Sequence, residues 1–445
     1  MSNVVDLSQT GNPIAGAQAL VDRVEQLVDD GALRPGDRLP PVRAAGAQLG
    51  LNPNTVASAY RTLGDRGTVI SEGRRGTFVA ARPALAGSAV AAVPAGLLDL
   101  ASGNPDPALL PPIDPYLSGL RGHETLYGAP NIDPLLSELL RAALAADGID
   151  AEHLAVVGGA LDGIERVLGA QLRPGDRVAI EDPGYSSVRE LVLALGLKVV
   201  PVAVDHAGPD PEALAVALAG DVAAVIVTSR AHNPTGAAID PTRAAALRAV
   251  LAEHPDVLVV EDDHAGPVAG QPFEHLVAPE RARWATVRSL AKAFGPDLRL
   301  AAVAGDRGTI SRVIGRQVLG AGWVSHILQQ LAAAMLADPE VPERLARAEA
   351  TYRDRRTRFV ERLAGHGVAV TTPSGLNVWI PVVDEAAVVV ALQQRGIAVR
   401  AGAPFRIKAA PGVRVSVAAA TNDVLDIVAD HLSDVVTSSA RVRSG

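Results

Sequence analysis

The chain has 445 residues and no cysteine, 48% of its residues are hydrophobic, and its formal net charge is −8. The length predicts two or three folded units with sizeable cores. The absence of cysteine excludes disulfides and thiolate metal sites. The negative charge argues against nucleic-acid binding by the chain as a whole, but it does not exclude a local basic surface. The start lacks the basic and apolar blocks of a signal peptide, and no apolar run is long enough to span a membrane, so we expect a cytoplasmic protein.

Three helices are predicted at the start of the chain. Apolar residues recur at helical spacing over residues 13–30, which indicates one amphipathic helix. A pair of prolines suits the first turn of a second helix that runs to about residue 49. Asn52 is a good N-cap and Pro53 a good first residue for a third helix, over residues 53 to about 66.

The third helix and the stretch after it have the character of a DNA-facing surface. Val56, Tyr60 and Leu63 share the inner face of this helix, and short polar side chains lie at the N-terminal end of its other face, where a recognition helix meets bases and phosphates. Residues 69–72 and 77–79 are typical of a hairpin with a basic tip between them. Over residues 31–79, seven arginines stand against three acids. This local excess fits a phosphate-facing surface.

These features resemble the winged helix-turn-helix DNA-binding domain of the GntR regulators. The resemblance is carried by the stretch from Gly36 to Arg43, by Gly50 to Val56 with Tyr60, and by the wing from Gly73 to Val79. It implies DNA contacts from Arg43, Asn52, Asn54, Thr55, Arg74, Arg75 and Gly76, and at Gly76 it is the wing backbone that approaches the DNA closely. Pro53 departs from the family, since many relatives have an arginine there. A solvated helix residue stays open for Arg43, and a plain surface hairpin for the wing.

The composition changes after the predicted DNA-binding domain, residues 1–80. Residues 81–96 are nearly all Ala, Pro, Gly, Val and Ser, which is typical of a linker. Prolines at 83 and 94 make a helix in the middle of this stretch unfavourable. The rest of the chain, residues 97–445, is predicted as one further domain, with a large part at about 125–325 and a small part at about 326–435.

Strand-like runs alternate with amphipathic stretches in this C-terminal region. Runs rich in Val or Ile lie at residues 153–157, 177–181, 198–204, 223–228, 257–261 and 300–304. The helical stretches between them include residues 161–172, 187–195 and 241–253. The alternation predicts an α/β domain with a mostly parallel sheet and helices on both faces. Ligands of such sheets bind beyond the carboxyl ends of the strands.

Polar turns follow several of these strands. Gly159 and Ala160 open a helix whose free N–H groups can hold a phosphate, although a plain turn explains them as well. Tyr185 can cover a flat ligand or simply pack on the surface. Asn233, in the stretch His-Asn-Pro-Thr-Gly, can donate to an oxygen, and the acids of the stretch Glu-Asp-Asp-His at 261–264 can pair with a cationic ligand.

Lys292 is the first candidate for chemistry because lysine is so rare in this chain. Arginine carries nearly all the positive charge, and the chain has three lysines, Lys198, Lys292 and Lys408. An amine can lose its proton and form a Schiff base, whereas a guanidinium cannot. The alternative is that Lys292 lies on a solvated turn.

Taken together, these turns resemble the fold-type I aminotransferases, which use pyridoxal 5′-phosphate (PLP). The resemblance covers about 340 residues, and its motifs are HNPTG, EDD and SLAKAFGPDLR. It implies that Lys292 holds PLP covalently and moves protons, that Asp262 keeps the pyridine nitrogen protonated, and that Asn233 and Tyr185 bind and cover the ring. It also implies that the phosphate is held by Ser289, Arg299, Gly159 and the Ala160 backbone. Arg414 binds a substrate carboxylate, or alternatively pairs with a surface acid.

Further residues carry implications of the same resemblance. Tyr127 matches a tyrosine that reaches a neighbouring subunit's phosphate, which implies a homodimer. His264 stands where a tyrosine is usual, so that its hydrogen bond to the ring oxygen is absent or different. Ala291 replaces a frequent serine, and residues 128–133 lack the usual glycine and arginine. These departures weaken the case for efficient transamination more than the case for PLP binding.

The two halves together resemble the MocR-type regulators over essentially the whole chain. The resemblance implies a PLP-binding transcriptional regulator whose aminotransferase-like domain senses PLP, an amino acid or an amine, with vitamin B6 or amino-acid metabolism as an output. The expected partners are an operator in double-stranded DNA, the effector, and a second copy of the chain. The alternative is a working aminotransferase with an accessory winged-helix domain.

Overall fold

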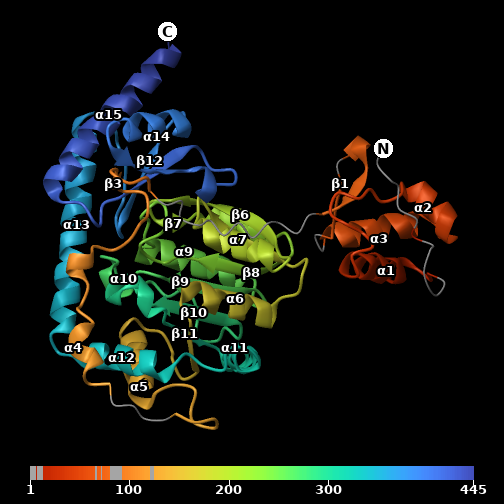
Figure 1. The fold of residues 1–445 in the computed structure, drawn as a ribbon, viewed down its shortest axis with the longest axis horizontal. Helices are drawn as coiled ribbons and strands as arrows, with labels where there is room; N and C mark the ends of the chain where they lie inside the picture. Colours follow the sequence, from red (N-terminus) through yellow and green to blue (C-terminus); the bar gives the residue numbers. More distant parts are fainter. Residues whose placement is uncertain are drawn as a thin grey trace. The chain divides into compact units, whose positions relative to one another are not determined.

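A computed structural model describes residues 7, 14–65, 68–71, 73–80, 93–120 and 125–444. The chain splits into two compact units, one that comprises residues up to 87 and one that comprises nearly all of the remaining residues. We call residues 14–80 the head and residues 93–444 the body. Figure 1 colours the head in red and orange, and the body from orange to blue. Most of the predicted linker, residues 81–92, lies outside the described residues.

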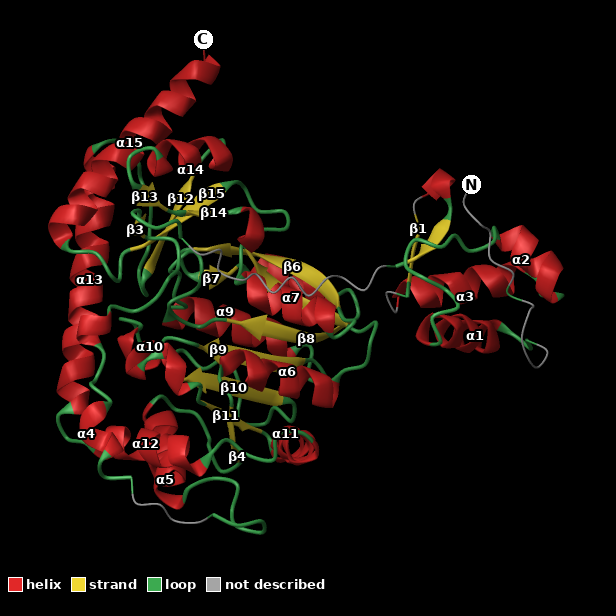
Figure 2. Ribbon diagram, in the orientation of Figure 1, coloured by secondary structure: helices red, strands yellow, loops and turns green. Residues whose placement is uncertain are grey.

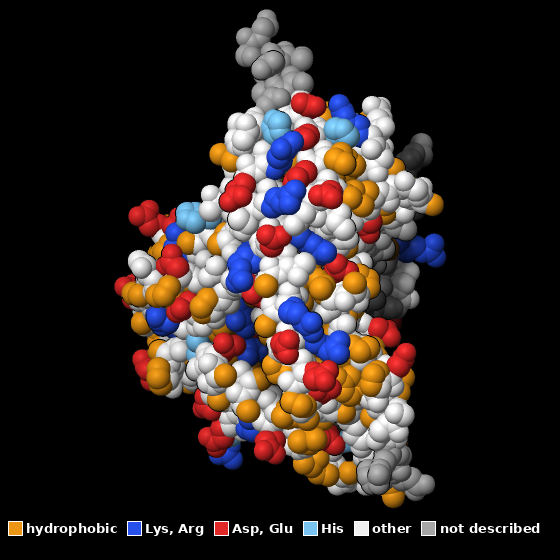
Figure 3. Space-filling view, turned by 90° about the vertical axis from the view of Figure 1, so that its left-hand side faces the viewer, with side chains coloured by type: hydrophobic (Ala, Val, Ile, Leu, Met, Phe, Trp, Pro, Cys, Tyr) orange, Lys and Arg blue, Asp and Glu red, His pale blue; other side chains and the backbone are white. Residues whose placement is uncertain are grey.

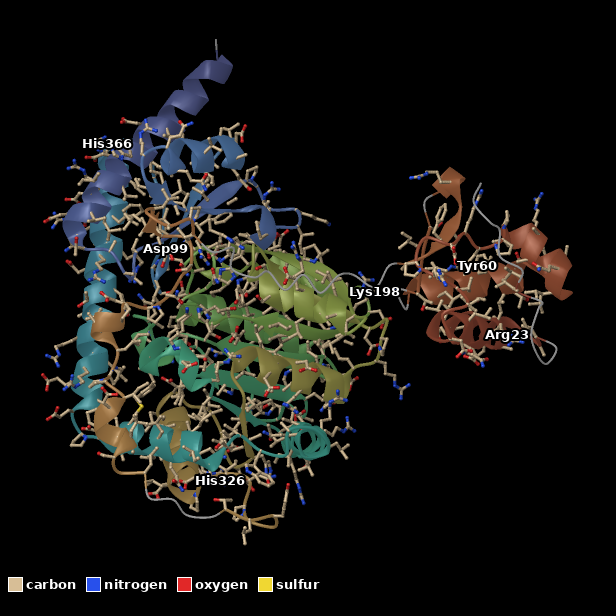
Figure 4. The ribbon with its side chains drawn as sticks, in the orientation of Figure 1. Arg23, Tyr60, Asp99, Lys198, His326 and His366 are labelled. Carbon is tan, nitrogen blue, oxygen red and sulfur yellow. The ribbon has the colours of Figure 1, made fainter. Side chains whose placement is uncertain are left out.

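The head contains three helices and a hairpin around one apolar core. The helices are α1 (Ala17–Asp29), α2 (Val42–Leu49) and α3 (Pro53–Asp65). The antiparallel strands are β1 (Val69–Ser71) and β2 (Thr77–Val79), with the 3-10 turn η1 (Gly73–Arg75) between them. Tyr60, labelled in Figure 4, is buried on α3, and its hydroxyl donates to the Pro40 carbonyl over 2.9 Å. The predicted winged helix-turn-helix is confirmed.

An eight-stranded sheet forms the centre of the body, in the order β4-β11-β10-β9-β8-β5-β6-β7. Strands β5, β8, β9 and β10 are parallel, whereas β11 is antiparallel to both of its neighbours. The bounds are β4 (Leu154–Val157), β5 (Arg177–Asp182), β6 (Lys198–Asp205), β7 (Gly208–Pro209), β8 (Val222–Val227), β9 (Leu258–Asp263), β10 (Trp284–Ser289) and β11 (Ala301–Gly305). The mostly parallel sheet is as predicted, and the six predicted strands end within two residues of the observed bounds.

Helices cover this sheet, whose strands are yellow in Figure 2. Helices α6 and α11 pack side by side against β10 and β11, and α8 packs against β5 and α9. The helices of the large part are α4 (Asp114–Leu117), α5 (Pro134–Ala146), α6 (Ala160–Gln171), α7 (Ser186–Ala194), α8 (Pro211–Leu218), α9 (Pro241–Ala252), α10 (Ala291–Phe294), α11 (Arg307–Leu319) and α12 (His326–Ala337), with the 3-10 turns η2 (Pro107–Leu109), η3 (Gly266–Val268) and η4 (Pro296–Leu298).

A second, smaller core lies toward the end of the chain. Its antiparallel sheet has the order β12-β15-β14, with β12 (Asn377–Pro381), β14 (Arg400–Ala401) and β15 (Gly412–Ser416). Its helices are α13 (Val341–Gly365), α14 (Glu385–Gln393) and α15 (Asn422–Ser444), with the 3-10 turn η5 (Ala403–Phe405). The parallel pair of β3 (Leu98–Asp99) and β13 (Ile397–Ala398) joins the first residues of the body to this part.

The surface of α13 and α15 carries alternating charges. Figure 3 faces the side of the body where these two helices lie, and basic and acidic side chains run down it together. Arg358 donates to Asp426, and Arg362 donates to Asp430 with both contacts at 2.7 Å. Such exposed pairs contribute little to stability. Among the described residues, no helix combines the length and apolar character needed to cross a membrane.

Candidate functional site

The body encloses a cavity of about 290 Å³ at the carboxyl ends of its central strands. Most of the site residues predicted from the sequence line this cavity, although they are spread over more than 250 positions of the chain. They are Ala160, Tyr185, Asn233, Asp262, His264, Ser289, Lys292, Arg299 and Arg414. The cavity is close to the lower end of the usual size range of small-ligand sites, and polar and charged side chains make up much of its lining.

Lys292 extends from the short helix α10 into the cavity. Its Nζ donates to the Gly103 carbonyl over 2.7 Å. Burial, together with the Arg414 guanidinium, lowers the pKa of this amine to about 8. An amine with such a pKa loses its proton close to neutral pH, which makes it a usable nucleophile.

Asp262 is a buried acid on strand β9 that lines the cavity, and one of its carboxylate oxygens has no partner in the part of the chain that the structure describes. Its Oδ1 has no hydrogen-bond partner among the described residues. Burial and the negative charges of Asp263 and Glu181 raise the pKa of its carboxyl to about 7. A cationic ligand group beside Oδ1 would hold this acid ionised and supply the missing partner.

The next acid, Asp263, is fully engaged by protein groups. It accepts from Arg230 Nε over 3.0 Å and from Arg288 Nε over 2.6 Å. These guanidiniums hold the pKa of the Asp263 carboxyl at about 2, against the effect of burial. The neighbouring acids of this strand therefore differ in role: Asp263 closes a buried ion-pair cluster, and Asp262 is the acid available to a ligand.

His264 lines the cavity beside Asp262 and Lys292. Burial and the positive charge of Lys292 lower the pKa of its imidazole to about 4. The ring is neutral at physiological pH, so that it can donate one hydrogen bond and accept another.

Hydrogen-bond donors suited to an anion gather at the start of α6. Gly159 is the N-cap of this helix with a φ of 109°, and its neighbour Ala160 lines the cavity. A Cβ at Gly159 would lie 3.1 Å from the Arg299 guanidinium, so the glycine allows this close approach. Ser289 and Arg299 line the same cavity. Helix N-terminal N–H groups, a hydroxyl and a guanidinium form a typical phosphate site.

Arg414 enters the cavity from β15 in the small part. Its Nη1 donates to Asn233 Oδ1 over 3.1 Å, and its Nη2 donates to the Ala101 carbonyl. Its guanidinium lies 5.1 Å from the centre of the Phe405 ring, and its buried Nε has no partner among the described residues. Burial, followed by the charge of Arg400, lowers the pKa of Arg414 to about 10. A carboxylate in the cavity would relieve both the repulsion and the missing contact.

Two predicted residues of the body are not part of the cavity lining, since Gly159 only adjoins it through Ala160 and Tyr127 lies apart from it, and several lining residues escaped prediction. Tyr127 is 94% exposed and packs edge-on against Trp323. The lining residues that the sequence did not single out include Ser102, Gly103, Asn104, Thr228, Asn377, Arg400 and Phe405. The sequence Ser-Gly-Asn-Pro at 102–105 is a turn signal that could have drawn attention to the first of these.

The predicted DNA contacts of the head lie on α2, α3 and the wing. Arg43 and Asn54 are exposed, and Thr55 is half-buried. Asn52 has a local task, because its Oδ1 accepts from the Asn54 backbone N–H over 2.9 Å as a helix cap. Gly76 has a φ of 114°, a backbone conformation that suits glycine. Arg75 is exposed, and the Arg74 side chain lies outside the described residues.

Two family models match the chain. The model of the aminotransferase class I and II family matches residues 96–432, and that of the bacterial regulatory proteins of the gntR family matches residues 17–79. Together these ranges include both the cavity and the winged helix-turn-helix.

Curated relatives extend over both halves. A vitamin B6 salvage pathway transcriptional repressor, PtsJ from Salmonella typhimurium, is 37% identical over 93% of this chain and 96% of its own length. The HTH-type transcriptional regulator TauR from Rhodobacter capsulatus is 29% identical over 88% of this chain and 90% of its own. The HTH-type pyridoxine biosynthesis transcriptional regulator PdxR from Corynebacterium glutamicum is 28% identical over 76% of each chain.

Solved structures similar to the body include aminotransferases. Kynurenine aminotransferase from Pyrococcus horikoshii superposes with a TM-score of 0.70 at 21% identity, over 78% of this chain and 92% of its own. Aspartate aminotransferase from Thermus thermophilus superposes with a TM-score of 0.67 at 26% identity, over 76% of this chain and 92% of its own. The fold-type I architecture predicted for the body is confirmed.

Proposed function

The chain belongs to the MocR-type transcriptional regulators, in which a GntR-family DNA-binding domain is fused to a class I and II aminotransferase domain, and we propose that its body senses PLP on behalf of its head. PLP, when bound, supplies an aldehyde that condenses with primary amines and a ring that withdraws electrons. The cavity residues fit this group by their chemistry. The unpartnered Oδ1 of Asp262 suits a pyridinium N–H, and the donors around Gly159, Ser289 and Arg299 suit a phosphate.

The observation that carries the proposal is the way the cavity holds residues 98–104, which we call the lead-in segment. This segment comes soon after the predicted linker, and it contains Asp99, labelled in Figure 4. Lys292 donates to the Gly103 carbonyl over 2.7 Å, and Arg414 donates to the Ala101 carbonyl. The two residues expected to engage PLP and an effector therefore also fix the chain that leads back to the head.

Ligand binding and the lead-in segment compete for the same donors. A Lys292 amine engaged by an aldehyde loses the free N–H groups that hold Gly103, and a carboxylate at Arg414 competes with the Ala101 carbonyl. If the lead-in segment has two arrangements, each ligand favours the one that frees its own site. Suppose that the two arrangements of the lead-in segment also differ in how strongly the heads bind DNA. Linkage then requires that a ligand that favours one arrangement changes the affinity for DNA.

The relatives support regulation of genes of vitamin B6 metabolism, because PtsJ is a repressor of vitamin B6 salvage and PdxR is a regulator of pyridoxine biosynthesis. A homodimer would bury apolar side chains that are exposed in the single chain. Leu126, Tyr127 and Leu319 are 70%, 94% and 89% exposed. Tyr127 packs against Trp323, which lies four positions after Leu319 in the chain, and a contiguous apolar patch of this kind would be typical of a surface that contacts a partner.

A mobility-shift assay on the DNA flanking the gene tests the proposal. The full chain is compared with and without PLP, alongside Lys292→Ala and the matched lysine variant Lys408→Ala, whose position lies outside the cavity. We expect PLP to change the affinity of the wild type and of Lys408→Ala for the operator by about fivefold or more. Lys292→Ala should lose both this response and the visible absorbance of the bound cofactor.

Two results would contradict the proposal. The first is an operator affinity that PLP leaves unchanged although the cofactor is bound, as judged by its absorbance. The second is steady turnover of amino donors with no specific DNA binding, which would favour a working aminotransferase with an accessory head.

A further inference from the structure

Two arginines face the cavity from neighbouring strands of the small part. Arg400 on β14 lies directly opposite Arg414 on β15 in the antiparallel register, and both line the cavity. Side chains of directly opposed residues project to the same face of a sheet, with Cβ atoms roughly 5 Å apart. The two guanidiniums therefore converge on one side of the cavity.

Arg400 has no counter-ion in the part of the chain that the structure describes, which sets it apart from its neighbours. No hydrogen bond or ion pair of its half-buried guanidinium occurs among the described residues. Arg406, six positions later, donates to Glu385 over 2.7 Å. The acid within the lead-in segment, Asp99, accepts from the Ala101 and Ser102 backbone N–H groups.

The charge of the cavity lining is strongly unbalanced. Among the described lining residues, four are basic, Lys292, Arg299, Arg400 and Arg414, whereas Asp262 is the one acid. PLP would engage Lys292 with its aldehyde, Arg299 with its phosphate and Asp262 with its ring nitrogen. Arg400 and Arg414 would then remain side by side without an ion pair among the described residues, although the charge of Asp99 acts on Arg414. Like charges this close are destabilising until an anion binds.

We propose that Arg400 is a second anion anchor, and that the cavity takes a dicarboxylic amino acid of four or five carbons as effector beside PLP. Arg414 binds one carboxylate and Arg400 the other, so that a ligand with two acidic groups compensates both charges. This inference rests on the proposed function, because the amino group of such an effector is expected to meet PLP. A monocarboxylate shared by both arginines is the competing arrangement.

Calorimetry separates the two arrangements without needing turnover. Glutarate and butyrate are titrated into the full chain, and L-glutamate and L-glutamine into the PLP-saturated chain. We expect the dicarboxylate of each pair to bind at least about tenfold more tightly. Arg400→Gln should weaken glutarate and glutamate by about tenfold and change butyrate and glutamine less than about twofold. The matched variant Arg395→Gln, an exposed arginine outside the cavity, should bind all four ligands like the wild type.

Equal affinities for the members of each pair would overturn the proposal, as would a loss at Arg400→Gln that is the same for butyrate as for glutarate. The two proposals fail separately. A PLP-dependent change in operator affinity with no preference for dicarboxylates leaves the sensor intact and removes the second anchor. If the preference for dicarboxylates depends on Arg400 but PLP does not change DNA binding, the second anchor stands and the proposed sensor function is wrong.

Discussion

Asp262 and Asp263 are neighbours on one strand, yet burial affects them in opposite ways. Asp263 lies between two guanidiniums and stays ionised, whereas Asp262 faces the cavity with a pKa near 7. Successive side chains of a strand point to opposite faces of the sheet. One of two consecutive acids can therefore form buried ion pairs, as Asp263 does, while the other faces the ligand cavity, as Asp262 does. The sequence assigned the ligand role to Asp262 through resemblance, and the environment of the two carboxylates gives that role a physical basis.

A pH dependence follows for the ligand-free chain. The pKa of Asp262 rises from 3.8 to about 7 on folding, so the folded state binds more protons between these values. Stability conferred by this acid is therefore present at low pH and is lost as pH rises through 7, by at most ~4 kcal/mol. We expect Asp262→Asn to be more stable relative to the wild type at pH 8 than at pH 5, as measured by urea unfolding.

The difference between the two chains is the quantity to follow. Burial lowers the pKa of His264 to about 4, so its contribution to stability rises with pH up to 6.5 in both chains and opposes that of Asp262 in the wild type. This contribution cancels to first order when the unfolding free energies of wild type and variant are subtracted. A difference that stays constant from pH 5 to 8 would contradict the raised pKa.

At the scale of the element, the turn after β8 is fixed by a glycine. Gly236 closes the stretch His-Asn-Pro-Thr-Gly with a φ of 69°. A Cβ there would meet the Thr372 methyl group and lie 2.8 Å from the Ser374 carbonyl oxygen. We expect Gly236→Ala to lower the free energy of unfolding by roughly 2–4 kcal/mol, through backbone strain and overpacking.

Gly315 provides the matched control for this substitution. It lies in the middle of α11, its φ is not positive, and a Cβ would meet nothing within 4 Å. Gly315→Ala should leave stability unchanged or raise it by up to about 1 kcal/mol, because alanine is the better helix former. Equal effects of the two alanines in a denaturant melt would show that the turn tolerates a side chain.

The elements that the sequence did not predict show where pattern reasoning stops. Strand β10 (Trp284–Ser289) was not assigned bounds, because Arg288 interrupts its apolar run. That arginine is buried, and its charge is balanced by Asp263 and Asp147, which are remote in sequence. Strand β8 (Val222–Val227) was predictable because its apolar run is continuous. Periodicity therefore identifies elements whose burial is apolar, and misses one whose burial depends on a distant ion pair.

Site residues divide in a similar way. Lys292, Asp262 and Arg414 could be named because each lies in a motif, and the structure brings all three to one cavity. Gly103 and Arg400 carry no motif. They reach the cavity through the pairing of β3 with β13 and of β14 with β15, which a local pattern does not encode. The site was predictable in its chemistry and less so in the groups that surround the effector.

At the scale of the whole molecule, the head must bind DNA within a chain of net charge −8. A local basic surface then makes affinity steeply dependent on salt, because each neutralised phosphate releases counter-ions. We expect Arg43→Ala to weaken operator binding and to reduce the slope of log K against log salt by about 1, if Arg43 contacts a phosphate. Binding isotherms at several salt concentrations measure this. An unchanged slope and affinity would identify Arg43 as a solvated helix residue.

The pairing of β3 with β13 also sets an order of events during synthesis. Residues of the head contact one another locally, so the head can fold as soon as it leaves the ribosome. Leu98 can pair only after Ile397 has been synthesised, and Lys292 can have Arg414 as a neighbour only after β15 has been synthesised. A ribosome that stops before β15 releases a chain whose head is complete and whose cavity lacks a wall. If the proposed function is right, such a fragment keeps the DNA-binding domain but lacks residues through which a ligand would change its affinity for an operator.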